Sequence, residues 1–268
     1  MRVRNFLLAF LAAAVALGAA VVFFQERFLF PGSPLGVERA AHIREHYPWV
    51  EEITVTAADG VKLQGWLVPA EGPLLIYFGG NSEDISHHIE SAPLLAGWSL
   101  LLVNSRGYGG SEGKPGQDSF FQDALALYDA AAAWDGVDEG MMAVMGRSIG
   151  SGVAVHLAAE RKVQGVILIS PYDSIEAVAR EQFPFLPVSR FLRHPFRVLE
   201  KAAGIQAPLL AVIGGKDRVI DPRRSLALVS AWGGARDVLI LEEKGHNNLQ
   251  EDPLFWERIG EFLEGLNP

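Results

Sequence analysis

The sequence has 268 residues and a formal net charge of −9, and 49% of its residues are hydrophobic. This composition suits one large α/β domain with a packed core and differs from that of a disordered chain. The lack of cysteine excludes disulfides, thiolate metal sites and cysteine nucleophiles, and the acidic balance without a run of Lys or Arg excludes nucleic acid as an expected partner.

The chain begins with an apolar run. Residues 6–24 carry no charge, and 19 residues of helix at about 1.5 Å each span roughly 28 Å, which matches the hydrocarbon core of a bilayer. Apolar residues continue through 21–24, so we favour a retained membrane anchor over residues 1–30; a cleaved signal peptide comes second and a buried soluble helix last. Arg2 and Arg4 precede the run, which predicts a cytoplasmic N-terminus and an extracytoplasmic domain, periplasmic if the source is bacterial.

The soluble part, residues 31–268, has the pattern of a parallel sheet covered by helices. Residues 53–56 and 63–68 alternate apolar and polar side chains across Asp59-Gly60, which predicts an antiparallel hairpin. Between the later strands lie helical patterns, such as the apolar spacing over 120–131. Continuous apolar runs, typical of strands buried on both faces, occur at 74–78, 99–104, 142–146, 165–170 and 209–214.

One segment breaks this alternation. Residues 175–204 contain three prolines and several aromatic side chains, which predicts a small cap inserted between two strands. Its apolar side chains could line a substrate pocket for an acyl group, or could serve ordinary packing. The candidates for this lining are Phe183, Phe185, Leu186 and Phe191.

Ser148 is the candidate nucleophile. It is the central residue of Gly146-Arg147-Ser148-Ile149-Gly150, a G-x-S-x-G pattern between an apolar strand run and a helical pattern. A nucleophile at such a turn needs small residues on both sides so that its strained backbone avoids clashes. A glycine-rich nucleotide-binding turn is the alternative, but these glycines lack the G-x-G-x-x-G spacing.

A serine hydroxyl needs an imidazole to accept its proton and a carboxylate to orient that imidazole. Asp217 follows the strand run 209–214, and His246 follows the strand-like residues 237–242. The chain order Ser, Asp, His therefore predicts a triad of Ser148, Asp217 and His246. Asp173, which also follows a strand, stays open as an alternative acid.

Two backbone N–H groups should stabilise the oxyanion that forms when the serine attacks. The residue after the nucleophile, Ile149, is expected to supply one of them. For the second we favour Asn81, in the glycine-containing loop 79–82 after an early strand, although that loop could be only a tight turn.

Five segments in chain order match one known pattern: YFGGNSED at 77–84, NSRGYGGSEG at 104–113, GRSIGSG at 146–152, GGKDRVIDP at 214–222 and GHNNL at 245–249. Together they resemble the alpha/beta-hydrolase superfamily, and within it the membrane-anchored serine-aminopeptidase-like and protein-depalmitoylase-like hydrolases. The resemblance implies an eight-stranded, mostly parallel sheet, a small helical cap, and hydrolysis without a metal or an organic cofactor. Gly79 departs from the histidine that is usual in the family's oxyanion loop.

The expected function is hydrolysis of carboxylic esters or thioesters with acyl or lipid-like chains. A peptidase would need acidic groups to hold the substrate's ammonium, yet residues 175–204 carry five basic side chains against three acidic ones. A serine peptidase is therefore the second hypothesis. A catalytically silent hydrolase fold acting as an envelope scaffold is the third.

Overall fold

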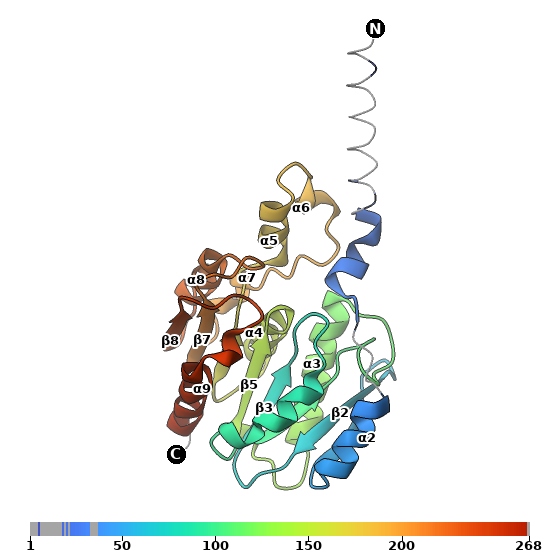
Figure 1. Cartoon of the computed structure of the whole chain (residues 1–268), viewed down its shortest axis with the longest axis vertical. Helices are drawn as coiled ribbons and strands as arrows, with labels where there is room; N and C mark the ends of the chain where they lie inside the picture. Colours follow the sequence, from blue (N-terminus) through green and yellow to red (C-terminus); the bar gives the residue numbers. More distant parts are fainter. Residues whose placement is uncertain (1–4, 6–17, 19, 21, 33–36, 267–268) are drawn as a thin grey trace.

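The computed structural model describes residues 5, 18, 20, 22–32 and 37–266 (Figure 1). Within them eight strands form one sheet in the order β1-β2-β4-β3-β5-β6-β7-β8. β2 runs antiparallel to β1 and β4, while the pairs from β4 through β8 are parallel. The strands are β1 (Glu51–Thr56), β2 (Lys62–Val68), β3 (Leu74–Phe78), β4 (Ser99–Val103), β5 (Met142–Arg147), β6 (Val166–Ile169), β7 (Leu209–Gly214) and β8 (Arg236–Leu241).

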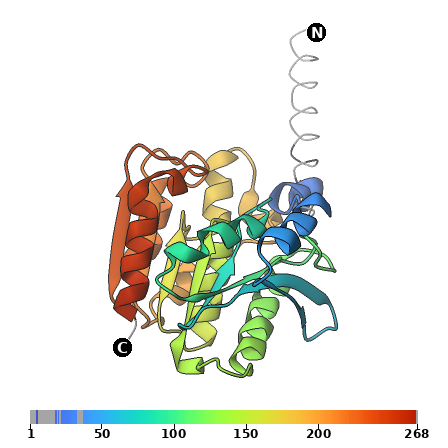
Figure 2. The ribbon, with the colours of Figure 1, turned by 60° about the horizontal axis from the view of Figure 1, so that its bottom comes forward.

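Helices cover both faces of this sheet (Figure 2). The α-helices are α2 (Val37–His46), α3 (Gln117–Ala132), α4 (Ile149–Glu160), α5 (Ile175–Gln182), α6 (Val188–Phe191), α7 (Leu199–Ala202), α8 (Pro222–Ser230) and α9 (Pro253–Leu266). The 3-10 helices are η1 (Ile85–Leu94), η2 (Glu139–Met141) and η3 (Leu249–Glu251).

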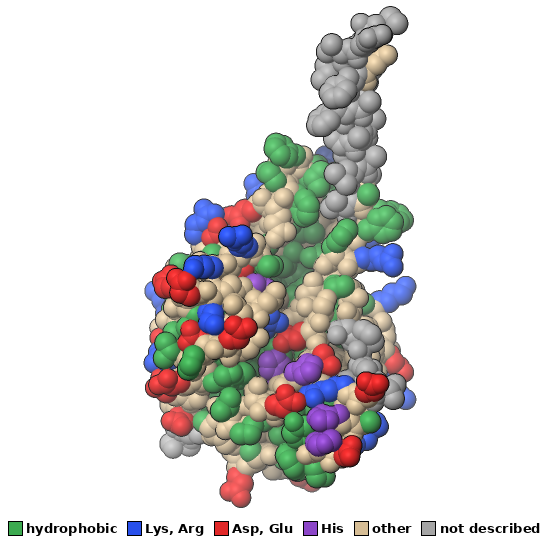
Figure 3. All heavy atoms as spheres, viewed as in Figure 1, with side chains coloured by type: hydrophobic (Ala, Val, Ile, Leu, Met, Phe, Trp, Pro, Cys, Tyr) green, Lys and Arg blue, Asp and Glu red, His purple; other side chains and the backbone are tan. Residues whose placement is uncertain are grey.

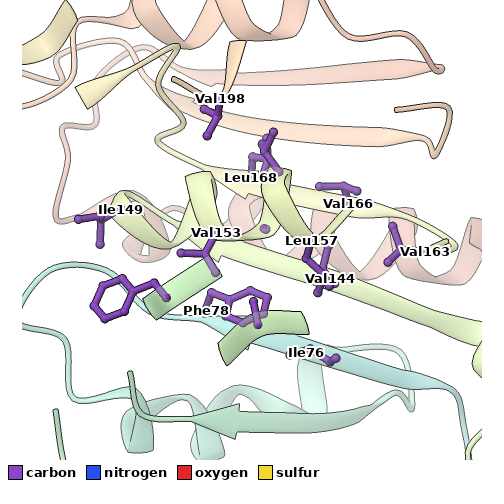
Figure 4. Packing of buried hydrophobic residues seen from close by; sticks show 14 of the residues in the cluster. Ile76, Phe78, Val144, Ile149, Val153, Leu157, Val163, Val166, Leu168 and Val198 are labelled. Atoms are coloured by element: carbon purple, nitrogen blue, oxygen red, sulfur yellow. The ribbon is translucent and has the colours of Figure 1, made fainter. Parts of the chain in front are cut away.

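The two faces have separate cores because successive strand residues point to opposite sides of a sheet. In β3, Ile76 packs with the α3 and α4 side, while Leu75 and Tyr77 pack with the side covered by α2, η1 and α9. Figure 4 shows the first core, where Val153 and Leu157 of α4 lie among the side chains of β3 and β5. Burial on both faces explains why these strands are continuous apolar runs.

The expected eight-stranded, mostly parallel sheet flanked by helices is confirmed, and its parallel strands position the candidate residues. β3, β5, β6, β7 and β8 run in one direction, so their carboxyl ends meet at one edge of the sheet. Ser148 follows β5, Asp217 follows β7 and His246 follows β8. The cap helices α5 and α6 follow β6 and therefore begin at this same edge.

The N-terminal segment joins the domain through residues 22–30, of which 22–29 are helical. The Phe30 ring is 5% exposed and packs in the core against Phe120, His194 and Phe196. Most of the predicted membrane anchor lies outside the described residues. Among those that are described, no helix is both long enough and apolar enough to cross a bilayer.

The predicted cap region divides into two parts. Helices α5 and α6 project from the sheet edge next to the N-terminal segment (Figure 1). The chain then returns to the interior, where Phe196, Val198 and Ala202 are fully or nearly fully buried. Only the portion before Phe196 therefore stands out from the domain.

Candidate active site

Ser148 lies at a sharp turn between β5 and α4. Its φ is 51° and its ψ is −120°, a backbone conformation that L-residues adopt only under strain. Its N–H donates to the carbonyl of Ile169 in β6, at 2.8 Å, which holds the turn against the sheet. A Cβ at Gly150 would collide with the carbonyl oxygens of Phe78 and Gly79, so only glycine fits beside this turn.

The structure brings the three predicted triad residues together. His246 Nε2 lies 3.0 Å from Ser148 Oγ, and His246 Nδ1 lies 2.7 Å from Asp217 Oδ2. A carboxylate can only accept, so Nδ1 carries the proton and Nε2 is left to accept the serine hydroxyl proton. The other carboxylate oxygen, Asp217 Oδ1, accepts from the N–H groups of Val219 and Ile220 at 2.8 and 2.9 Å.

Asp217 is buried but its environment favours the charged form. Burial raises the pKa of Asp217, and the hydrogen bond from His246 together with those from Val219 and Ile220 outweighs that effect, so its pKa lies below the usual value. The side chain of Asp217 is 2% exposed and that of His246 is 10% exposed. The acid is therefore shielded from water and fixed in its role as an acceptor for imidazole.

The two predicted oxyanion donors are Ile149, which directly follows Ser148, and Asn81, in the loop 79–82 after β3. Neither the Ile149 N–H nor the Asn81 N–H donates a hydrogen bond to any of the residues described, so both are available to a ligand. The loop 79–82 packs against the turn, since a Cβ at Gly80 would lie 3.6 Å from the Arg147 carbonyl oxygen. The Asn81 side chain is fixed by a donated bond to the Phe28 carbonyl at 3.3 Å and an accepted one from the Tyr108 hydroxyl at 3.4 Å.

Similarity to known proteins identifies the family. Residues 85–189 match the family model described as serine aminopeptidase, S33. The chain is 31% identical over 263 residues to an uncharacterized protein of Mycobacterium tuberculosis, covering 94% of this chain and 92% of that protein. It is also 27% identical over 283 residues to the alpha/beta hydrolase domain-containing protein WAV2 of Arabidopsis thaliana, covering 93% and 91% respectively. The chain belongs to the alpha/beta-hydrolase superfamily.

A solved structure has the same hydrolase fold. An esterase of Pyrococcus furiosus superposes with a TM-score of 0.66 at 21% identity, over 81% of this chain and 91% of that one. This likeness concerns the fold, and the reaction has to be argued from the site.

A contact network that the sequence motifs do not predict surrounds Arg147. One nitrogen, Arg147 Nη2, donates to the carbonyl of His246 at 3.2 Å and to Asn247 Oδ1 at 3.0 Å. The other, Nη1, lies 3.3 Å from Glu83 Oε2. Arg147 therefore joins the loop that carries His246 to the segment after β3. A charged residue in the second position of a buried G-x-S-x-G turn was the available signal, because such a charge requires a partner.

Glu83, the acidic partner of Arg147, makes the remaining contacts of this network. It accepts from the Tyr77 hydroxyl at 2.9 Å and from the Gly80 N–H, and it contacts His88 Nε2 at 2.8 Å. Burial raises the pKa of Glu83, but the hydrogen bond from His88 and the charge of Arg147 outweigh it and hold the pKa at about 2. Glu83 thus holds the backbone of the loop 79–82 in place through the Gly80 N–H.

The remaining acids have other roles. Asp173, the alternative triad acid, contacts Arg224 Nη1 at 2.9 Å and the Ser174 N–H at 2.6 Å. Asp221 caps α8 by accepting from the Arg223 N–H. Among the described residues, no cluster of three His, Asp or Glu side chains is arranged to hold a metal ion.

A cavity of about 720 Å³ lies within the cap. Of the four residues predicted to line a substrate pocket, Leu186 lines this cavity, together with Arg180, Arg190 and Arg224. The other three, Phe183, Phe185 and Phe191, are 42%, 97% and 46% exposed. The lining does not include Ser148 or His246, so the assignment of all four residues to a substrate pocket stays a prediction.

Proposed function

We propose that this chain is a serine hydrolase that cleaves carboxylic esters or thioesters through an acyl-enzyme. The observation that carries the proposal is the continuous relay from Ser148 Oγ through His246 to Asp217, with contacts of 3.0 and 2.7 Å. In this reaction Ser148 Oγ attacks the acyl carbon while His246 Nε2 takes the hydroxyl proton. His246 then returns the proton to the leaving alcohol or thiol as the bond from the acyl carbon to that group breaks.

The second half of the cycle reverses these roles. A water molecule, deprotonated by His246, attacks the acyl-enzyme, and the proton returns to Ser148 Oγ as the free acid departs. The oxyanion of both tetrahedral intermediates would be held by the N–H groups of Ile149 and Asn81. The proposed chemistry uses only side chains, backbone groups and water.

The charges near the cap favour ester over amine substrates. An aminopeptidase binds the substrate's ammonium with a carboxylate that is not already engaged. Glu176 pairs with Arg197 at 2.6 Å, while Asp173 and Glu181 both pair with Arg224. The esterase of Pyrococcus furiosus with the same fold is consistent with this choice.

A serine peptidase is the second candidate, because the family model that matches residues 85–189 is described as serine aminopeptidase. The two candidates differ in the bond that they cleave. Purified protein should be assayed with p-nitrophenyl esters of graded chain length and with aminoacyl amides. Turnover of the esters alone supports the first proposal, and turnover of the amides without the esters supports the peptidase.

Labelling with a fluorophosphonate probe tests whether Ser148 is a nucleophile at all. The intact protein should react, Ser148→Ala should not, and Ser230→Ala, which changes an exposed serine in α8, should react like the intact protein. Lack of labelling in all three proteins would favour the third hypothesis, a catalytically silent scaffold.

We also propose that residues 1–30 anchor the domain in a membrane, with the N-terminus in the cytoplasm and the domain on the other side. The uncharged run over 6–24 and the preceding Arg2 and Arg4 support this orientation. Carbonate washing of membranes from expressing cells tests the anchor: retention in the pellet supports it. Release, with an N-terminus that begins beyond residue 24, would show a cleaved signal peptide instead.

A further inference from the structure

The hydrolase carries exposed phenylalanines on two segments that are far apart in the sequence. Phe23, Phe24 and Phe28 of the N-terminal segment are 72%, 45% and 68% exposed. In the cap, Phe183, Phe185 and Phe191 are also exposed, and Phe185 at 97% has almost no protein contact. Hydrophobic side chains gather at this end of the molecule (Figure 3). We call these six residues the phenylalanine surface, and we propose that it contacts the acyl region of a lipid bilayer.

Buried hydrogen bonds hold the two halves of the phenylalanine surface together. The Gln25 side chain is buried, and its Nε2 donates to the Phe191 carbonyl at 3.1 Å while its Oε1 accepts from the Arg193 N–H at 2.8 Å. Glu26 adds an ion pair with Arg193 at 3.0 Å. A buried amide with both ends satisfied fixes its partners, so cap and N-terminal segment present their phenylalanines as one unit.

The cap also reaches along the apolar run itself. A Cβ at Gly18 would lie 3.0 Å from Leu186 Cδ2, so the cap loop that holds Leu186 lies beside residue 18. A helix rises about 9 Å over the six residues from Gly18 to Phe24. If the run 6–24 lies in a bilayer, Leu186 and the neighbouring Phe185 are at the depth of the run's last third.

Lipid is the occupant that these observations favour over a second protein. Phe23 and Phe24 are the last residues of an uncharged run of membrane-spanning length. A bilayer that surrounds this run therefore also surrounds Phe23 and Phe24. Aromatic side chains next to basic ones are typical of surfaces at the boundary between headgroups and acyl chains. The cap fits this pattern, since residues 175–204 hold five basic residues against three acidic ones in a chain of net charge −9.

The consequence concerns how a substrate reaches the serine. The cap begins at the sheet edge where β5 ends and Ser148 follows. A bilayer in contact with the phenylalanine surface therefore lies on the same side of the sheet as the candidate active site. Acyl chains could then enter from the membrane without crossing water. This inference rests on the proposed anchoring of residues 1–30 and gives the proposed esterase a membrane-resident acyl substrate.

The absence of native cysteine allows a direct test with the full chain. Phe185→Cys, Phe28→Cys and Trp49→Cys would each be labelled with the fluorophore NBD and mixed with vesicles of phosphatidylcholine and phosphatidylglycerol. Trp49 is the matched control, because it is 57% exposed but precedes β1, which starts at the opposite edge of the sheet. We expect the emission of the fluorophore at positions 185 and 28 to shift to shorter wavelength and to be quenched by brominated lipid, with no change at position 49.

Other outcomes overturn the inference in distinguishable ways. If the protein floats with the vesicles but position 185 shows no shift, the proposed anchor is supported and the proposed lipid contact of the phenylalanine surface is overturned. If the protein does not bind vesicles, both the proposed anchor and the proposed lipid contact are overturned. A blue shift at position 185 without lipid, rising with protein concentration, would assign the surface to a second copy of the chain. Fluorophosphonate labelling of the same samples reports on Ser148 separately, so failure of the proposed hydrolase activity is visible by itself.

Discussion

Arg147 donates a hydrogen bond to the backbone carbonyl of His246 at 3.2 Å, so the residue directly before Ser148 holds the loop that carries His246. The same guanidinium contacts Glu83, which directly follows the loop 79–82 that holds the expected oxyanion donor. A single side chain therefore links two loops that must keep their spacing for the proposed reaction. We regard Arg147 as a positioning residue, because none of its contacts involves a reacting atom.

Replacing Arg147 with methionine should lower kcat by about tenfold to a hundredfold, since small displacements of catalytic groups have effects of that size. The KM for a short p-nitrophenyl ester should change little. Arg147→Lys should restore part of the rate, because an ammonium can still reach one of the partners. The matched control is Arg161→Met, which breaks a comparable pair with Asp129 on the surface away from the site. Wild-type kcat in Arg147→Met, with unchanged Tm, would contradict the positioning role.

Asp217→Asn should reduce kcat by on the order of 10³–10⁴-fold while the fold is retained. The N–H groups of Val219 and Ile220 require an acceptor at Oδ1, so the new amide nitrogen must point at His246. His246 Nδ1 then has to accept, and its Nε2 carries the proton and can no longer act as a base. Asp173→Asn, which alters the alternative acid beside Arg224, should keep kcat near that of the wild type. Esterase assays on both variants decide between the two acids.

The acid side of the stability profile should depend on Glu83. Its pKa in the folded chain is about 2, below the ordinary 4.5, so the charged form stabilises the fold. This contribution is complete above about pH 4.5 and is lost as the pH falls toward 2, because the unfolded chain binds the proton first. Glu83→Gln should therefore be less stable than the wild type near neutral pH, and the two should converge in acid.

Urea denaturation at several pH values measures this convergence. The exposed Glu139→Gln on η2 serves as the control and should follow the wild-type curve. Parallel curves for Glu83→Gln and the wild type, with a constant difference in free energy of unfolding down to about pH 3, would contradict the assignment.

Gly150→Ala should destabilise the fold by about 1–3 kcal/mol and abolish fluorophosphonate labelling, because the added methyl group forces the loop after β3 away from the turn. The matched control is Gly265→Ala in α9, where a Cβ would meet open space. That change should leave labelling intact and should raise stability by up to about 1 kcal/mol, since alanine favours a helix over glycine. Calorimetric Tm values and probe labelling of both variants provide the check.

The sequence predicted the strands and the candidate site residues where the evidence lies within one short segment. Strands buried on both faces read as apolar runs, and Ser148 and Asp217 could be selected because each follows such a run. His246 could be selected because it follows the strand-like residues 237–242. Parallel strands end at one edge, which is why chain order was enough to predict that these three residues meet.

The features that the sequence did not predict depend on contacts between distant residues. The partners Arg147 and Glu83 are brought together only when β3 pairs with β5. Phe196 belongs to an aromatic segment that reads as part of a cap, yet its ring is fully buried against Phe30. No periodicity within residues 175–204 distinguishes an aromatic side chain that projects from one that returns to the core.

The burial of Phe30 has a practical consequence for any shortened recombinant version of this hydrolase. A chain begun at residue 31 would leave a hole among Phe120, His194 and Phe196, and losing a buried phenylalanine ring destabilises a protein by about 3–5 kcal/mol. It would also strip the cap of the Gln25 amide that satisfies two of its backbone groups. A soluble version for crystallisation should therefore start no later than Val22.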